Sequence, residues 1–189
     1  MGRIGVFGGR FDPPHAAHLI HARLVFEMFE LDKILFIPAA NPPHKEVYAS
    51  FTDRVQMLGL AIEENASFEV SEIEWKEGIS YTVDTLRRFK ALFAPTQLFL
   101  ILGRDEYECL NTWHEPERII EMAELVVLPR GMKQGTSSKP GIHFPDLPLL
   151  DISSSDIRKR VASGKPIRNW VPQKVETYIR QQNLYKEGL

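Results

Sequence analysis

The feature that most constrains the fold of this 189-residue chain is an alternation of two kinds of segment. Apolar runs rich in β-branched residues are separated by stretches with the spacing of amphipathic helices. Three of the runs are nearly continuous, which is typical of strands buried on both faces of a parallel sheet. The pattern predicts a Rossmann-like, open parallel α/β sheet with helices on both faces. The expected strands are residues 3–7, 33–37, 68–70, 97–102 and 124–128, and the expected helices lie near 16–30, 52–64, 81–93 and 116–122.

The composition changes after residue 130. Residues 131–148 are rich in Gly, Ser, Lys and Pro, and they predict an irregular connection. A helical stretch then follows the serines at 153–155 and ends at Gly164, a typical helix stop. Residues 172–185 predict a terminal amphipathic helix opened by its proline. We therefore expect a single domain, residues 1–189, with a small helical C-terminal part at about 153–189.

Composition excludes several classes of protein. With 43% hydrophobic residues the chain is not globally disordered. No run of about 18 apolar residues occurs, and no cleavage-like site follows the apolar start, so we expect neither a membrane span nor a signal peptide. The single cysteine, Cys109, excludes an internal disulfide and favours the cytoplasm. A net charge of −2 gives no general attraction to nucleic acid, so we expect no nucleic-acid partner.

The first expected strand runs into the segment GGRFDPPHAAH, residues 8–18, which precedes a helix. Gly8 and Gly9 permit close approach of a ligand to the backbone. His15 and His18 lie three residues apart near the helix start and can share a face. A helix N-terminus with free N–H groups and two imidazoles predicts a cradle for phosphate. The glycine spacing fits neither a Walker A loop nor the G-x-G-x-x-G dinucleotide fingerprint.

Two other interpretations of this segment remain. The first is a glycine turn followed by surface histidines, since short motifs are weak signals. The second is a zinc site, because His21 continues the three-residue spacing. Three successive positions of that spacing rotate around a helix, however, and no acidic or cysteine ligand accompanies them. We therefore expect no resident metal site.

Residues 8–18 resemble the G-G-T/S-F-D-P-x-H-x-G-H signature of the nucleotidyltransferase superfamily, which is related to class I aminoacyl-tRNA synthetases. Within that superfamily the chain is most similar to the bacterial nicotinate-mononucleotide adenylyltransferases. The resemblance covers nearly the whole chain, because further segments fall in the order of that family. They are PPHK at 42–45, SYTVDTL at 80–86, GRD at 103–105 with Trp113 downstream, ISSSDIR at 152–158, and C-terminal positions from Val171 to Tyr185.

Three residues depart from the family pattern. Arg10 stands where Thr or Ser is usual, and it could add a phosphate contact or point to solvent. Ala17 stands where Gly is usual and is still small enough for close approach of a ligand. Arg104 replaces a small residue of the G-x-D motif, so its local contacts are open.

The resemblance implies an ATP site formed by the first motif and the ISSSDIR segment. Independently of the family, Ser153 and Asp156 predict a capped helix start. Capping accounts for the serines but not for Arg158, which could bind a phosphate bidentately. Asp105 could contact ATP or cap a helix. The implied ATP-binding residues are Gly8, Gly9, Phe11, His15, His18, Asp105, Ile152, Ser153, Ser154 and Arg158.

The resemblance assigns the mononucleotide substrate to Lys45, Tyr81, Thr82 and Trp113. Lys45 lies on a proline-stiffened loop and would bind the substrate phosphate. Tyr81 and Thr82 begin an expected helix, where free N–H groups favour a carboxylate such as that of nicotinate. Trp113 offers an aromatic face to the pyridine ring. Without the family, a packed or surface tryptophan would be the preferred interpretation of Trp113.

The implied reaction, a step of NAD biosynthesis, transfers the adenylyl group of ATP to nicotinate mononucleotide and yields nicotinate adenine dinucleotide and pyrophosphate. As catalytic residues, His18 would stabilise the α-phosphoryl transition state and His15 would hold phosphate oxygens. Mg²⁺ would arrive with ATP, because no dense carboxylate cluster is visible. The alternatives are a different acceptor, such as nicotinamide mononucleotide or phosphopantetheine, a nucleotide sensor without turnover, and a Rossmann dehydrogenase, which the missing fingerprint disfavours.

Overall fold

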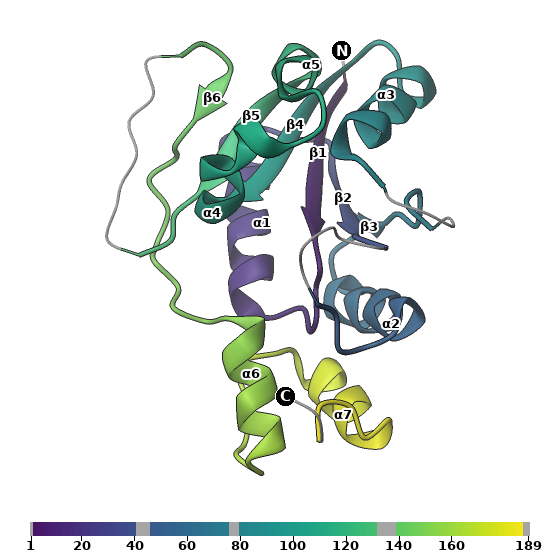
Figure 1. Ribbon diagram of the computed structural model, residues 1–189, viewed down its shortest axis with the longest axis vertical. Coiled ribbons are helices and arrows are strands. Elements are labelled where there is room, and N and C mark those ends of the chain that lie inside the picture. Colours follow the sequence, from purple (N-terminus) through teal and green to yellow (C-terminus); the bar gives the residue numbers. More distant parts are fainter. Residues whose placement is uncertain (1, 41–45, 76–79, 132–138, 187–189) are drawn as a thin grey trace.

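The computed structural model describes residues 2–40, 46–75, 80–131 and 139–186. Its strands form a six-stranded sheet in the order β3-β2-β1-β4-β5-β6, and every neighbouring pair is parallel (Figure 1). The confirmed fold class is therefore a Rossmann-like α/β sheet. The strands are β1 (Gly2–Gly9), β2 (Lys33–Pro38), β3 (Phe68–Val70), β4 (Thr96–Gly103), β5 (Ala123–Leu128) and β6 (Ile142–His143).

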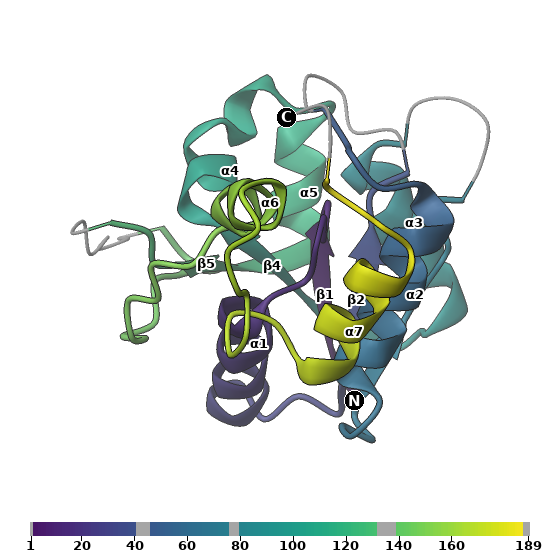
Figure 2. The same cartoon turned by 90° about the horizontal axis from the view of Figure 1, so that it is seen from below.

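Helices cover both faces of the sheet (Figure 2). The helices α1 (Ala16–Met28) and α2 (Phe51–Ile62) pack on one face, and α7 (Gln173–Gln181) packs against α2. The other face carries α3 (Thr82–Leu92), α4 (Arg104–Glu108) and α5 (Pro116–Met122), with a 3₁₀ turn at Leu110–Thr112. The remaining helix, α6 (Ser154–Ala162), lies beside α7 beyond the carboxyl ends of the strands (Figure 1).

The two layers follow from the alternation of side chains along each strand. Leu98 and Leu100 of β4 join the core beneath α3 and α5, whereas Phe99 and Ile101 join the core beneath α1 and α2. All four side chains are almost completely buried, as expected for a strand with helices on both faces. A Cβ atom on Gly5 of β1 would lie 2.9 Å from carbon atoms of Ile34 and Leu31, so only glycine allows this close packing.

Short elements and helix ends differ from the expectations. The sequence did not predict β6 or α4, because two and five residues are too few to show a period. The terminal helix ends at Gln181 rather than 185, since Asn183 and Tyr185 have φ angles of 53° and 61° and turn the chain back. The end of α6 is as expected, with Gly164 at φ 68° just beyond it.

The strand order determines where the loops after β1 and β4 lie. The chain first builds outward from β1 through β2 to β3, and then returns to the other side of β1 with β4. In open α/β sheets a ligand binds outside the carboxyl ends of the strands at such a reversal. The segments that leave β1 and β4 therefore flank the expected crevice. Across the described ranges of the chain, no helix combines the length and the apolar character that a bilayer crossing needs.

Candidate active site

The loop after β1 is anchored by one buried aromatic ring. Phe11 has a φ of 49° and is 2% exposed, and its ring packs against those of Phe7 and Phe36 at centroid distances of 5.6 and 5.8 Å. A Cβ atom on Gly9 would lie 3.0 Å from the Phe11 ring, whereas a Cβ atom on the exposed Gly8 would meet nothing within 4 Å. The loop is thus held from below, and the Gly8 side leaves room for a ligand.

His15 and His18 form a stacked pair at the start of α1. Their ring centroids are 3.6 Å apart, and the backbone N–H of His15 donates to Nδ1 of His18 at 3.2 Å. The His18 ring also packs edge-on against Phe11 at 5.0 Å. Because Nδ1 of His18 accepts a hydrogen bond, a neutral His18 carries its proton on Nε2. This hydrogen bond therefore selects the tautomer in which Nε2 is the donor.

Both histidines are neutral in this site at neutral pH. Burial, followed by the nearby His21 and Arg130, lowers the pKa of His15 to about 3. Burial, followed by the two other histidines, lowers the pKa of His18 well below its usual value. His21 is itself buried and donates from Nε2 to the carbonyl of Pro148 at 2.9 Å. The imidazoles of His15 and His18 are therefore uncharged hydrogen-bond donors. His21 instead holds the segment that contains Pro148.

Substitution of His15 by asparagine is expected to make the free energy of unfolding fall less steeply as the pH is lowered from 7 to 5. The unfolded chain takes up a proton on this histidine below pH 6.5, whereas the folded chain does not until about pH 3. Stability that is present above pH 6.5 is therefore lost as the pH falls, by about 2 kcal/mol between pH 7 and 5. Urea unfolding at pH 7, 6 and 5 measures the slope. His114→Asn, which removes an exposed imidazole, is the control, and an unchanged slope in His15→Asn would contradict this expectation.

The start of α6 is joined to the first motif. Oγ of Ser153 caps this helix by accepting from the N–H of Asp156 at 3.1 Å. Oγ of Ser154 donates to the carbonyl of Pro13 at 2.9 Å. Ile152, just before the cap, packs against the core beneath α1 and α2. The structure thus brings the two motifs together, although 141 residues separate Ser154 from Pro13.

Arg158 is buried at this junction rather than extended into solvent. Its Nη1 donates to the carbonyl of Asp12 at 2.8 Å, its Nη2 donates to Ser155 Oγ at 3.2 Å, and its guanidinium lies 4.1 Å from the Tyr48 ring centroid. Arg158 therefore supports the first motif and leaves its buried Nε–H without a hydrogen-bond partner among the described residues.

Asp105 faces an arginine that the sequence did not single out. It lies in the first turn of α4, whose N-cap is Gly103, and its carboxylate pairs with Arg130. Arg130 follows β5 at the carboxyl edge of the sheet, and its charge contributes to the lowered pKa of His15. The signal in the sequence was its place two residues after an expected strand.

The three departures from the family pattern have ordinary local contacts. Arg10 donates to the carbonyl of Glu46 at 3.0 Å. Ala17 is 5% exposed in α1. Arg104 pairs with Glu108 at 2.9 Å and lies 5.1 Å from the centroid of the Phe144 ring. Both arginines thus contact other residues of the protein.

A second group of predicted residues gathers at the start of α3. Tyr81 is the N-cap of this helix, Thr82 is its first residue, and the Tyr81 ring lies 4.5 Å from the ring of His114. The neighbouring Trp113 is partly buried against the core beneath α3 and α5. The structure therefore places Tyr81 close to the segment that carries Trp113. Lys45, the remaining predicted contact of the mononucleotide, lies outside the described residues.

Arg54 is a structural centre that sequence reasoning missed. It is 1% exposed in α2, and it donates to the carbonyls of Arg10 at 3.0 Å, Ala39 at 2.7 Å and Ala40 at 3.4 Å. One side chain thus joins the loops that leave β1 and β2. Nothing in the sequence distinguishes it from the surface arginines of other amphipathic helices.

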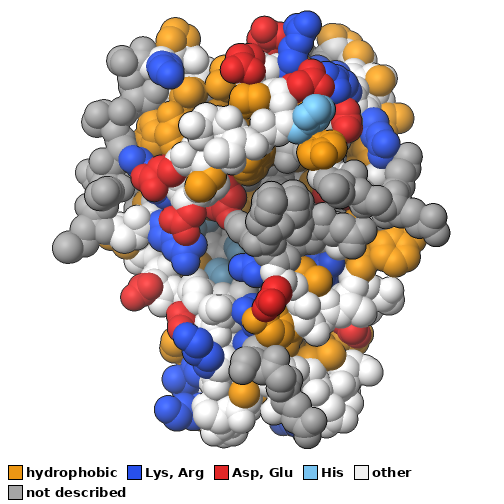
Figure 3. Space-filling view, in the orientation of Figure 1, with side chains coloured by type: hydrophobic (Ala, Val, Ile, Leu, Met, Phe, Trp, Pro, Cys, Tyr) orange, Lys and Arg blue, Asp and Glu red, His pale blue; other side chains and the backbone are white. Residues whose placement is uncertain are grey.

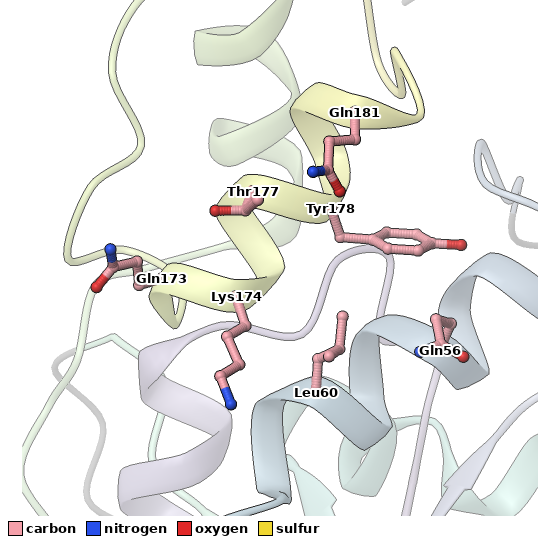
Figure 4. Close-up of a pocket in the computed structure, with 7 residues that line it drawn as sticks. All are labelled: Gln56, Leu60, Gln173, Lys174, Thr177, Tyr178 and Gln181. Carbon is pink, nitrogen blue, oxygen red and sulfur yellow. The ribbon is translucent and has the colours of Figure 1, made fainter.

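The surface over the site is recessed. In the space-filling view, histidine side chains lie in a hollow between the levels of α4 and α6, with Lys and Arg side chains beside them (Figure 3). A separate pocket of about 530 Å³ lies between α2 and α7 (Figure 4). None of the predicted site residues lines that pocket, which is formed by Gln56, Leu60, Gln173, Lys174, Thr177, Tyr178 and Gln181.

The glycine loop, the two stacked histidines at the start of α1 and the start of α6 thus lie together beside the parallel sheet. A cytidylyltransferase-like family model matches residues 6–160, and the chain belongs to this family. Within it, the chain belongs to the nicotinate-nucleotide adenylyltransferases. A probable member from Thermus thermophilus is 42% identical and one from Desulfitobacterium hafniense is 38% identical, each alignment covering 97% of this chain and 100% and 96% of the relatives. The resemblance inferred from the motifs is confirmed.

Solved structures agree on the fold. The Plasmodium falciparum nicotinic acid mononucleotide adenylyltransferase complexed with NaAD superposes with a TM-score of 0.87. The two chains are 22% identical, and the alignment covers 100% of this chain and 99% of the other. At that identity the likeness establishes the architecture alone.

Proposed function

We propose that this protein transfers the adenylyl group of ATP to nicotinate mononucleotide, yielding nicotinate adenine dinucleotide and pyrophosphate. The observation that carries the proposal is the Nε2–H donor of His18 at the carboxyl end of β1, fixed by the hydrogen bond to its Nδ1. Relatives about 40% identical over nearly the whole length are described as nicotinate-nucleotide adenylyltransferases, which supports this choice of reaction.

In the proposed reaction the phosphate of the mononucleotide attacks the α-phosphorus of ATP. A new bond forms between a substrate phosphate oxygen and that phosphorus, and the bond from the α-phosphorus to the bridging oxygen breaks, so that pyrophosphate leaves with the electron pair. His18 donates from Nε2 to an α-phosphoryl oxygen as charge develops there, and His15 holds an adjacent oxygen. The protein supplies position and charge stabilisation, and forms no covalent intermediate.

The ATP site that we propose lies between the first motif and α6. Gly8 and Gly9 admit the nucleotide beside the backbone, and Phe11 anchors their loop to the core. The start of α6, at Ile152, Ser153 and Ser154, provides N–H groups for phosphate oxygens, and Arg158 adds its unused Nε–H. Asp105 and its partner Arg130 border the same crevice and complete the site.

The mononucleotide site that we propose lies at the start of α3. The first-turn N–H groups of this helix, at Tyr81 and Thr82, receive the nicotinate carboxylate. Trp113 stacks on the pyridine ring, and Lys45 binds the phosphate. The acidic substrate thus meets a helix dipole at one end and a cation at the other.

The proposed cofactor is Mg²⁺ carried by ATP. In the described part of the chain, no group of three or more His, Cys, Asp or Glu side chains is placed to hold a metal ion. We therefore propose that the ion is held by the phosphates of ATP and by water rather than by a cage of protein side chains. When bound, Mg²⁺ supplies charge neutralisation on the phosphates of ATP.

We also propose that residues 1–189 form a single domain that works in the cytoplasm with ATP and nicotinate mononucleotide as its partners. One cluster of buried side chains includes Phe7 and Phe36 of the sheet together with Ile157 and Val175 of the C-terminal part. A continuous core of this kind supports one folding unit.

The experiment that tests the reaction compares two acceptors. With ATP and Mg²⁺, kcat/KM for nicotinate mononucleotide is expected to exceed that for nicotinamide mononucleotide by about ten- to a hundredfold, because only the acid places a charge on the α3 start. Product dinucleotide is quantified by chromatography. Equal values for the two acceptors would refute the nicotinate assignment. No pyrophosphate with either would favour a sensor without turnover.

A further inference from the structure

Asp12 of the first motif is a completely buried carboxylate. Its Oδ2 accepts the backbone N–H of Tyr48 at 2.7 Å, and its Oδ1 accepts the backbone N–H of Ala49 at 3.2 Å. Oδ1 also accepts the hydroxyl of Tyr185 at 2.6 Å. A buried carboxylate depends on such donors, because they replace the water it has lost.

Tyr185 reaches this carboxylate from the far end of the chain. It follows α7, has a φ of 61°, and is 6% exposed. Burial and the adjacent Asp12 carboxylate raise the pKa of its hydroxyl. The phenol therefore keeps its proton and remains a donor. The contact spans 173 residues, so no local pattern of the sequence contains it.

The backbone beside Asp12 is held by the segment proposed to bind ATP. The carbonyl of Asp12 accepts from Arg158, and the carbonyl of Pro13 accepts from Ser154. The guanidinium of Arg158 lies over the ring of Tyr48, whose own N–H binds the Asp12 carboxylate. A shift of the Asp12 carboxylate would therefore move the support of Arg158 and the backbone that leads into His15.

We propose that Tyr185 is a positioning residue for ATP, which acts through Asp12 and makes no contact with the nucleotide. The inference rests on the proposed function, since it assumes that His15 and Arg158 meet ATP. Without the Tyr185 hydroxyl, the carboxylate has one donor fewer inside the protein, and the peptide from Asp12 to His15 relaxes. The C-terminal turn thereby completes the nucleotide site.

The chain offers a matched control for this experiment. Tyr178 of α7 also donates its hydroxyl to an aspartate, Asp53 of α2, at 2.8 Å. That contact joins α7 to α2 and involves no residue of the first motif or of α6. Tyr185→Phe and Tyr178→Phe each remove one hydroxyl and leave the ring. Only the first change disturbs Asp12.

Both variants and the wild type are assayed with ATP and nicotinate mononucleotide varied in turn, at a temperature where circular dichroism shows all three folded. Tyr185→Phe is expected to lower kcat/KM for ATP by about tenfold, as loss of a hydrogen bond to a charged group would, and to leave the KM for the mononucleotide within about twofold. Tyr178→Phe is expected to retain the wild-type values of both.

Two results would overturn the inference. One is wild-type kinetics in Tyr185→Phe, with only its melting temperature lowered, since the contact would then be structural alone. The other is an equal loss in both tyrosine variants, which would indicate a general effect of α7. The activity of the wild type distinguishes a failure of this inference from a failure of the proposed function. If the wild type made no dinucleotide, the proposed function would fail, and calorimetric ATP affinity of the same variants would decide the role of Tyr185.

Discussion

Replacement of His18 by alanine is expected to lower kcat by about 100- to 1000-fold and to leave ATP affinity within severalfold. The proposed Nε2–H bond strengthens as charge develops on the α-phosphoryl oxygens, so its loss falls on the transition state rather than on the bound substrate. Removal of one oriented donor of this kind costs about 2.7–4 kcal/mol. Steady-state kinetics with ATP varied measures kcat, and calorimetry measures ATP binding.

His21 provides the control for this substitution. It lies on the same helix one turn further on, and its ring donates to the carbonyl of Pro148 instead of facing the crevice. His21→Gln is expected to change stability and to keep kcat near the wild-type value. A His18→Ala variant with near-normal kcat would mean that the stacked histidines have no catalytic role.

The sequence predicted those features of the site that depend on neighbouring residues. His15 and His18 lie one helical turn apart, and Ser153 and Asp156 form a local cap, so spacing alone was enough to identify both helix starts. The sheet was predictable because long apolar strands alternate with helices. The order of the strands then brought the loop after β1 to the reversal in the sheet.

The remaining features depend on contacts between distant segments. The sequence indicates an arginine at position 158, but its hydrogen bond to the carbonyl of Asp12 spans 146 residues. The tautomer of His18 depends on the backbone N–H of His15, which requires the local geometry. Arg130 and Arg54 belong to no short motif. Such residues become visible only once the fold shows which carbonyls and carboxylates surround them.

Arg54 shows how much of the scaffold can depend on one such residue. Its guanidinium holds the carbonyls of Arg10, Ala39 and Ala40, which belong to loops at the carboxyl edge of the sheet. Methionine would fill a similar volume but donate no hydrogen bond. The three carbonyls would then lose their donor at partly or fully buried positions, where an unpaired carbonyl is costly.

Arg54→Met is therefore expected to lower the free energy of unfolding by about 3–5 kcal/mol, a loss typical of a broken buried polar network. Urea unfolding followed by circular dichroism measures the change. Arg88→Met is the matched control, because the exposed Arg88 of α3 donates to one carbonyl, that of Ile73, at 3.1 Å. Its loss should cost only about 0.5–1.5 kcal/mol, as for a single exposed hydrogen bond. Equal losses in the two variants would show that the loops after β1 and β2 keep their arrangement without Arg54.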